Sequence, residues 1–172
     1  MLALVSLFFL PVSRADISKE YQLKAAFLYN FTKFVEWPSR CFANATSPIT
    51  ISILGDNPFA EELETAVRGR RVNGRPVVVK VIDSIAQADD AQVLFVAAKN
   101  EARLGGTLGA LQQTGVLTVG ESRQFAAMGG IITFTLQTDK VRFQINQPAS
   151  EQAGLRINAQ LLKLATVVHS AP

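Results

Sequence analysis

The chain has 172 residues, of which 48% are hydrophobic and 18% are charged, and it carries a formal net charge of +3. This composition is typical of one globular domain with its own core, and it excludes a disordered protein. The basic residues are spread along the chain apart from a group at residues 68–75, which includes two glycines. Nucleic-acid-binding modules carry a denser basic stripe with interleaved aromatic residues, so we expect no nucleic acid as a partner.

The N-terminal segment has the features of an export signal. Residues 2–10 form an apolar run broken by a single serine, and Ser13 and Ala15 fit the small-residue positions of a signal-peptidase site. The run is far shorter than the roughly 20 residues that span a bilayer. We therefore expect residues 1–15 to be a cleaved signal peptide and residues 16–172 to form a single α/β domain. No Lys or Arg precedes the run, which leaves open an upstream start codon, a buried N-terminal segment or an uncleaved anchor.

The first long helix is expected over residues 17–37. Its apolar residues recur at helical spacing, and Pro38 ends it because the residue before a proline is disfavoured in helical geometry. Tyr29, Lys33 and Trp37 recur every four residues on a second face. A helix that is apolar over most of its circumference is either buried on several sides or in contact with a partner.

From residue 49 onward, apolar β-branched runs alternate with helical patterns. Strands that alternate with helices favour a parallel sheet covered on both faces, and a late hairpin adds an antiparallel part. We therefore expect a three-layer α/β sandwich with a mixed sheet of about five or six strands. The expected elements are strand 49–54, helix 59–67, strand 76–82, helical turn 84–88, strand 93–97, helix 103–113, strand 116–119, helix 123–128, hairpin strands 131–136 and 141–145, and helix 157–168.

The residues that support catalysis or metal binding do not gather in the sequence. A hydrolytic triad needs a base beside its nucleophile, usually histidine, and the only histidine is His169, near the end of the sequence. A zinc site needs several His or Cys ligands, whereas this chain offers only His169 and Cys41. We therefore expect no catalytic residues, no metal, no cofactor and no enzymatic activity. An enzyme with a concealed Ser–Lys or carboxylate pair is the least favoured alternative.

One loop has the position of a small-ligand site. Gly55, Asp56, Asn57 and Phe59 follow an apolar strand and lead into a helix, where backbone N–H groups can hold an anion. The loop lacks the glycine patterns of dinucleotide and P-loop sites, so nucleotide binding is not expected. A module that binds an unknown small ligand at these four residues is the main alternative to a protein-binding function.

The run Lys24–Pro38 is similar to the first-helix signature of the YfiR-like family of periplasmic proteins. Later segments resemble the same family in the same order, over nearly all of residues 16–172. They are Ile53–Phe59, Gly74–Val77, Val93–Val96, Val116–Gly120, Phe125–Gly130, Val141–Asn146 and Ala153–Ala165.

The resemblance implies a regulator in the periplasm, with an α/β sandwich around a mixed sheet. Its implied partner is the periplasmic sensor domain of a YfiN-like inner-membrane diguanylate cyclase, whose repression lowers cyclic di-GMP and biofilm formation. A YfiB-like outer-membrane lipoprotein and a second copy of the chain are further partners that the resemblance suggests. The best-known member carries paired cysteines. This chain has Cys41 alone, which excludes control through an internal disulfide.

Tyr29, Lys33 and Trp37 are the candidate partner-binding residues. Trp and Tyr dominate many interface hot spots, and Lys33 lies one turn from each ring, within reach of a cation–π contact. The competing interpretation is that this face belongs to the core.

Overall fold

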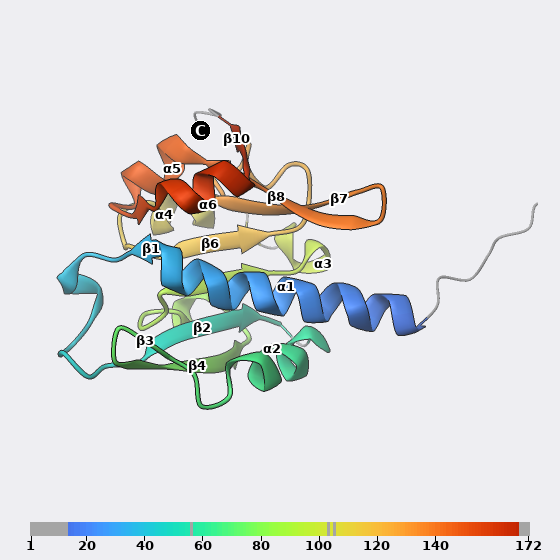
Figure 1. Ribbon diagram of the computed structural model, residues 1–172. Coiled ribbons are helices and arrows are strands. Elements are labelled where there is room, and N and C mark those ends of the chain that lie inside the picture. The colour runs from blue at the N-terminus through green and yellow to red at the C-terminus, as the bar shows by residue number, and fades with distance from the viewer. Residues whose placement is uncertain (1–13, 56, 103, 105, 169–172) are drawn as a thin grey trace, which may run out of the picture.

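The computed structural model describes residues 14–55, 57–102, 104 and 106–168, and their largest sheet has eight strands (Figure 1). Its strands are β2 (Ile49–Leu54), β3 (Arg71–Val72), β4 (Arg75–Ile82), β5 (Val93–Val96), β6 (Leu117–Gly120), β7 (Ile132–Gln137), β8 (Lys140–Asn146) and β10 (Thr166–Val168). They are arranged in the order β10-β8-β7-β6-β5-β2-β4-β3. Strands β4, β2, β5, β6 and β7 are parallel, whereas β3, β8 and β10 run the opposite way. The predicted mixed sheet is confirmed, although the two short edge strands raise its size above the expected five or six strands.

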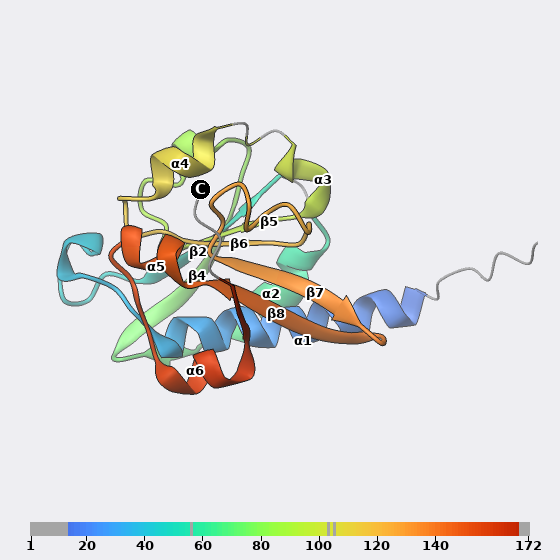
Figure 2. The same ribbon diagram turned by 90° about the horizontal axis from the view of Figure 1, so that it is seen from above.

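Helices cover both faces of this sheet, as the three-layer prediction required (Figure 2). They are α1 (Arg14–Phe34), α2 (Phe59–Val67), α3 (Ala98–Glu101), α4 (Thr107–Leu111), α5 (Gln147–Gln152) and α6 (Ala159–Leu164), with short 3-10 turns η1 (Ser39–Cys41) and η2 (Ile85–Gln87). Helices α1, α2 and α6 lie on one face, and α3 and α4 lie on the other.

Strand β5 shows how the sequence builds the two cores. All four of its side chains are fully buried, because a central parallel strand is covered on both faces. Side chains of a strand alternate between faces, so Val93 and Phe95 join the core under α1 while Leu94 and Val96 join the core under α4. This explains why the strand appears in the sequence as an uninterrupted apolar run.

Strands β7 and β8 form the predicted hairpin. Its two-residue turn places Thr138 and Asp139 at φ values of 49° and 58°, the left-handed geometry of a type I′ turn that matches strand twist. The pairing of β6 with β7 is confined to Val119–Ile132 and Gly120–Thr133. The tip of the hairpin therefore projects past the end of β6 (Figure 1).

The predicted end of the first helix is wrong. Helix α1 ends at Phe34, and Val35 and Glu36 form strand β1, which pairs with β9 (Arg156–Ile157) in a separate two-stranded sheet. This long-range pairing draws the chain out of the helix before Pro38. Trp37 consequently lies outside α1 rather than on its surface.

Three other predicted helices differ from the observed elements. The helix expected over 103–113 is shortened to α4, which begins after Gly106, and α3 precedes the predicted range. Glycine disfavours a helix interior. Residues 123–128 form turns. The helix expected over 157–168 is shortened to α6, with β9 before it and β10 after it.

The predicted signal peptide, residues 1–15, lies outside the described residues except for Arg14 and Ala15, which begin α1. Across the described part of the chain, no helix has both the length and the apolarity needed to cross a membrane.

Candidate functional site

The predicted partner-binding residues do not form one helix face. Tyr29 is half-buried on α1, with the Lys33 ammonium and the Arg70 guanidinium each 5.6 Å from its ring centre. The cation–π contact expected between Lys33 and Tyr29 is therefore present. Trp37 lies beyond the helix, where its indole N–H donates a 3.2 Å hydrogen bond to the backbone oxygen of Gln92.

Lys33 and Trp37 nevertheless share a hollow at the amino ends of the parallel strands. Its volume is about 500 Å³, and Phe42 and Arg75 also line it. The Arg75 guanidinium stacks 3.8 Å from the Phe42 ring centre. The structure thus brings Lys33 together with Trp37 in a surface hollow and with Tyr29 through a ring contact.

Cys41 lies at the same end and is partly buried. Its thiol is 3.9 Å from the backbone oxygen of Thr114. Burial raises the pKa of the Cys41 thiol, and nearby Arg40 acts in the opposite direction. A raised pKa leaves less of the reactive thiolate at neutral pH.

The loop predicted to hold a small ligand uses its side chains internally. The Asn57 side-chain oxygen accepts a 3.0 Å bond from the backbone N–H of Phe59, which starts α2. The Phe59 ring is fully buried, 4.6 Å from the ring of Phe95. Gly55 adopts φ 80° with the Asn100 side chain packed against it. Asp56 lies outside the described residues, and a ligand site here stays a prediction.

At the carboxyl ends of the parallel strands, a charge cluster joins α1 to the sheet. Lys24 is 6% exposed although it is charged. Its ammonium donates a 2.6 Å hydrogen bond to Glu121, just after β6, and also pairs with Glu20 one turn earlier on α1. Burial lowers the pKa of Lys24, but the hydrogen bonds and charges of Glu121 and Glu20 outweigh it, so the pKa lies above its ordinary value of 10.5.

A partly buried carboxylate, Glu121, and a buried one, Glu101, extend this cluster to the backbone. The second oxygen of Glu121 accepts a bond from the Ala98 N–H, at the start of α3. Glu101, which is 3% exposed, accepts bonds of 2.6 and 2.8 Å from the backbone N–H groups of Glu121 and Ser122. Its other oxygen has no hydrogen-bond partner among the residues described. The cluster therefore fixes α1, α3 and the segment after β6 relative to one another.

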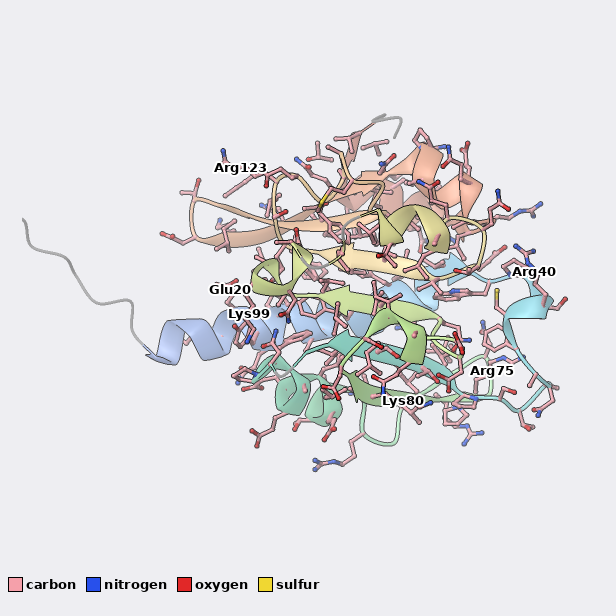
Figure 3. The ribbon with its side chains drawn as sticks, turned by 180° about the vertical axis from the view of Figure 1, so that it is seen from behind. Glu20, Arg40, Arg75, Lys80, Lys99 and Arg123 are labelled. Carbon is pink, nitrogen blue, oxygen red and sulfur yellow. The ribbon has the colours of Figure 1, made fainter. Side chains whose placement is uncertain are left out.

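A cleft of about 810 Å³ opens beside Lys24. One wall is the first part of α1, with Tyr21 and Lys24, and the other includes residues 134–137 of β7. Arg123 and Glu20 lie at this end of the molecule, whereas Arg40 and Arg75 lie at the opposite end (Figure 3). The cleft is thus separated from the Trp37 hollow by the length of the sheet.

The chemistry of this cluster suits structure and recognition. In the described ranges, no group of three or more His, Cys, Asp or Glu side chains is placed to hold a metal ion. Lys24 is raised in pKa and paired with two carboxylates, which leaves it protonated at neutral pH and a poor general base.

Sequence reasoning did not single out Lys24, Glu101 or Glu121. A signal was present for Lys24, since Glu20 and Lys24 are spaced i, i+4 within a helix that is otherwise largely apolar. For Glu101 and Glu121 the sequence separation of 20 residues hides the contact, which only the parallel packing of β5 and β6 creates.

Comparison with solved structures identifies a related fold. A crystal structure of a conserved domain protein from Vibrio cholerae O1 biovar El Tor matches with a TM-score of 0.57 at 14% sequence identity. The match covers 86% of this chain and 59% of that one, and this likeness concerns the fold alone. No curated protein matches the sequence.

The family comparison covers almost all of the described fold. The model for the YfiR/HmsC-like family matches residues 21–166, from the second turn of the described part of α1 to the first residue of β10. This confirms the resemblance carried by the first-helix run and the later segments. The chain belongs to the YfiR/HmsC-like family, whose members are in general periplasmic regulators of cyclic di-GMP synthesis rather than enzymes.

Proposed function

We propose that the mature protein is a periplasmic repressor that binds the sensor domain of a YfiN-like inner-membrane diguanylate cyclase. Binding holds the cyclase inactive and lowers cyclic di-GMP, and with it biofilm formation. The observation that carries this proposal is the family match over residues 21–166. Sequestration of the repressor by a YfiB-like outer-membrane lipoprotein belongs to the same proposal.

The geometry supports a binding function over a catalytic one. The charged side chains that lie deepest, Lys24 and Glu101, are engaged with Glu121 or with the backbone beside it. Recognition by a surface needs no such reactive group. It needs a rigid framework with exposed features, and both ends of the sheet provide hollows of several hundred Å³.

Export is part of the proposal. We propose that residues 1–15 are removed by signal peptidase and that the protein acts from Asp16 onward. The check is cell fractionation followed by intact-mass measurement of the periplasmic protein. A mass that corresponds to retention of residues 1–15, or a protein confined to the cytoplasm, would contradict export by this signal.

The decisive experiment is a pull-down from inner membranes with the purified protein, together with measurement of cellular cyclic di-GMP after deletion of its gene. We expect a diguanylate cyclase in the pull-down and a higher cyclic di-GMP level in the deletion strain. An unchanged cyclic di-GMP level and a pull-down without a cyclase would overturn the proposal.

The predicted surface is tested with the same assay. Tyr29→Ala combined with Trp37→Ala removes two aromatic side chains, and circular dichroism checks that the double variant is folded. If these residues bind the cyclase, affinity falls at least about tenfold, the size expected of a hot-spot truncation. Equal affinity in a folded double variant would remove Tyr29 and Trp37 from the interface.

A further inference from the structure

The free edge of β7 points to a second recognition element. We infer that an extended segment of the partner protein, carrying an acidic side chain, pairs with residues 134–137 as an additional strand in the cleft beside Lys24. This inference rests on the proposed function, because it takes the cyclase sensor domain as that partner.

The hydrogen-bonding pattern of the hairpin shows which groups are free. Residue pairs in an antiparallel ladder alternate between bonded and non-bonded. Gln137 and Lys140 close the two-residue turn, and the Asn146 N–H bonds the Ile131 oxygen at 2.8 Å, so the odd-numbered residues of β7 bond to β8. The N–H and C=O of Leu136 therefore face away from β8.

Among the described residues, no strand other than β8 pairs with this part of β7. The ladder between β6 and β7 stops at Gly120 and Thr133, because the chain turns at Glu121 and the backbone N–H groups of Glu121 and Ser122 bond to Glu101. Within the described part of the chain, the backbone N–H and C=O of Leu136 have no hydrogen-bond partner. An unpaired strand edge is a template for strand addition.

The cleft follows this edge. Four consecutive residues, 134–137, line it, although side chains of a strand alternate between faces. A cleft lined by residues of both faces passes the edge of the strand, and Gln144 of β8 also lines it. Four residues of extended strand span roughly 13 Å.

The opposite edge of the hairpin is protected and the β7 edge is not. Strand β8 carries Lys140 and Arg142 beyond the point where β10 pairs with it, at Gln144. Charged residues on an edge discourage pairing with another strand. The segment 134–137 reads Phe-Thr-Leu-Gln and has no charge, and the Leu136 side chain is 58% exposed.

One cation in the cleft lining is available to an acidic side chain of the occupant. Glu20 and Glu121 are already paired with Lys24. Arg123 is exposed at the cleft and, across the described ranges, forms no ion pair. A carboxylate on the incoming segment would therefore meet an available guanidinium, and guanidinium–carboxylate bonds are among the stronger polar contacts.

Amide hydrogen exchange on the complex tests the edge directly. The ¹⁵N-labelled protein is measured alone and with the unlabelled sensor domain of the cyclase recovered in the pull-down. In the free protein we expect the Leu136 amide to exchange rapidly, while those of Thr135 and Gln137 are protected by β8. Addition of the sensor domain is expected to protect Leu136 at least about tenfold.

A pair of variants at one position separates backbone from side chain. Leu136→Pro removes the outward N–H without removing a bond to β8, and proline is tolerated where the N–H of an edge strand faces outward. Leu136→Ala keeps the N–H. We expect about a tenfold loss of affinity for Leu136→Pro beyond any loss for Leu136→Ala. Arg123→Glu is expected to weaken binding, while Arg68→Glu, an exposed arginine elsewhere, leaves it unchanged.

The outcomes distinguish this inference from the proposed function. If the wild-type protein binds no cyclase sensor domain, the proposed function fails and this inference falls with it. If it binds and the Leu136 amide still exchanges rapidly, strand addition is wrong while the proposed function stands, even if Leu136→Pro proves unfolded. Protection of Leu136 that rises with protein concentration in the absence of partner would instead assign the edge to a second copy of this chain.

Discussion

At the amino ends of the parallel strands, Gln92 joins separate segments through neutral hydrogen bonds. Its side chain accepts a 2.8 Å bond from the Thr50 N–H and donates a 2.8 Å bond to the Cys41 oxygen, and its backbone oxygen accepts from Trp37. At the carboxyl ends, Glu121 joins α1 and α3 to the sheet through charged groups. The two ends therefore hold their peripheral segments by different interactions.

This difference indicates which end of the fold depends on pH. Neutral hydrogen bonds do not titrate, so the bonds that Gln92 makes at the amino end do not change with pH. The charged end depends on the protonation of Lys24, whose pKa is raised by Glu121 and Glu20. Its ion pairs also fix one wall of the cleft, so changes at this end alter a recognition surface together with stability.

The largest effect is expected from Gln92→Ala at the neutral end. This change leaves the buried Thr50 N–H without its acceptor and removes the bond to Cys41. We expect a loss of about 2–4 kcal/mol in the free energy of unfolding, because an orphaned buried group adds its desolvation cost to the lost bond. Urea denaturation measures it.

The matched control is Gln113→Ala, since Gln113 is exposed. An exposed substitution of this kind changes stability by less than about 0.5 kcal/mol. If both variants unfold at the same urea concentration, Gln92 does not organise the amino end.

A smaller effect is expected from Lys24→Met at the charged end. Methionine fills similar space but leaves Glu121 and Glu20 without their cation. Glu121 keeps its bond from the Ala98 N–H, and its side chain is 16% exposed to solvent. Both features limit the loss in the free energy of unfolding to about 1–3 kcal/mol. Lys19→Met, at an exposed position on the same helix, is the control and should be nearly neutral.

The smallest effect is a dependence on pH that belongs to Lys24. Its pKa is raised in the folded state above 10.5, so its stabilising contribution is complete below the unfolded pKa and is lost as pH rises through the folded pKa. We expect the stability difference between wild type and Lys24→Met to be constant from neutral pH to about 10 and to shrink above it. A difference that instead grows in alkaline solution would show that the paired form is not the stabilising one.

The site was less predictable than the fold. The apolar runs at residues 49–54 and 93–97 and the polar turn between β7 and β8 identified strands because their signals are local. The helix expected over 17–37 was too long, because β1 depends on pairing with β9, some 120 residues away. Lys24, Glu101 and Glu121 were overlooked for the same reason: their meeting depends on three elements that are distant in the chain.

The sequence by itself determined the α/β class, the buried parallel strands, the presence of the hairpin and the family of this protein, because periodicity, turn residues and motif order are properties of contiguous segments. Only the tertiary structure decided that Trp37 lies outside the helix and that the buried Lys24 pairs with Glu20 and Glu121. It also decided that β7 extends past the end of β6, which leaves part of its edge unpaired. Each of these depends on where separate elements end relative to one another. Packing and strand register set those positions, and neither can be read from any one segment.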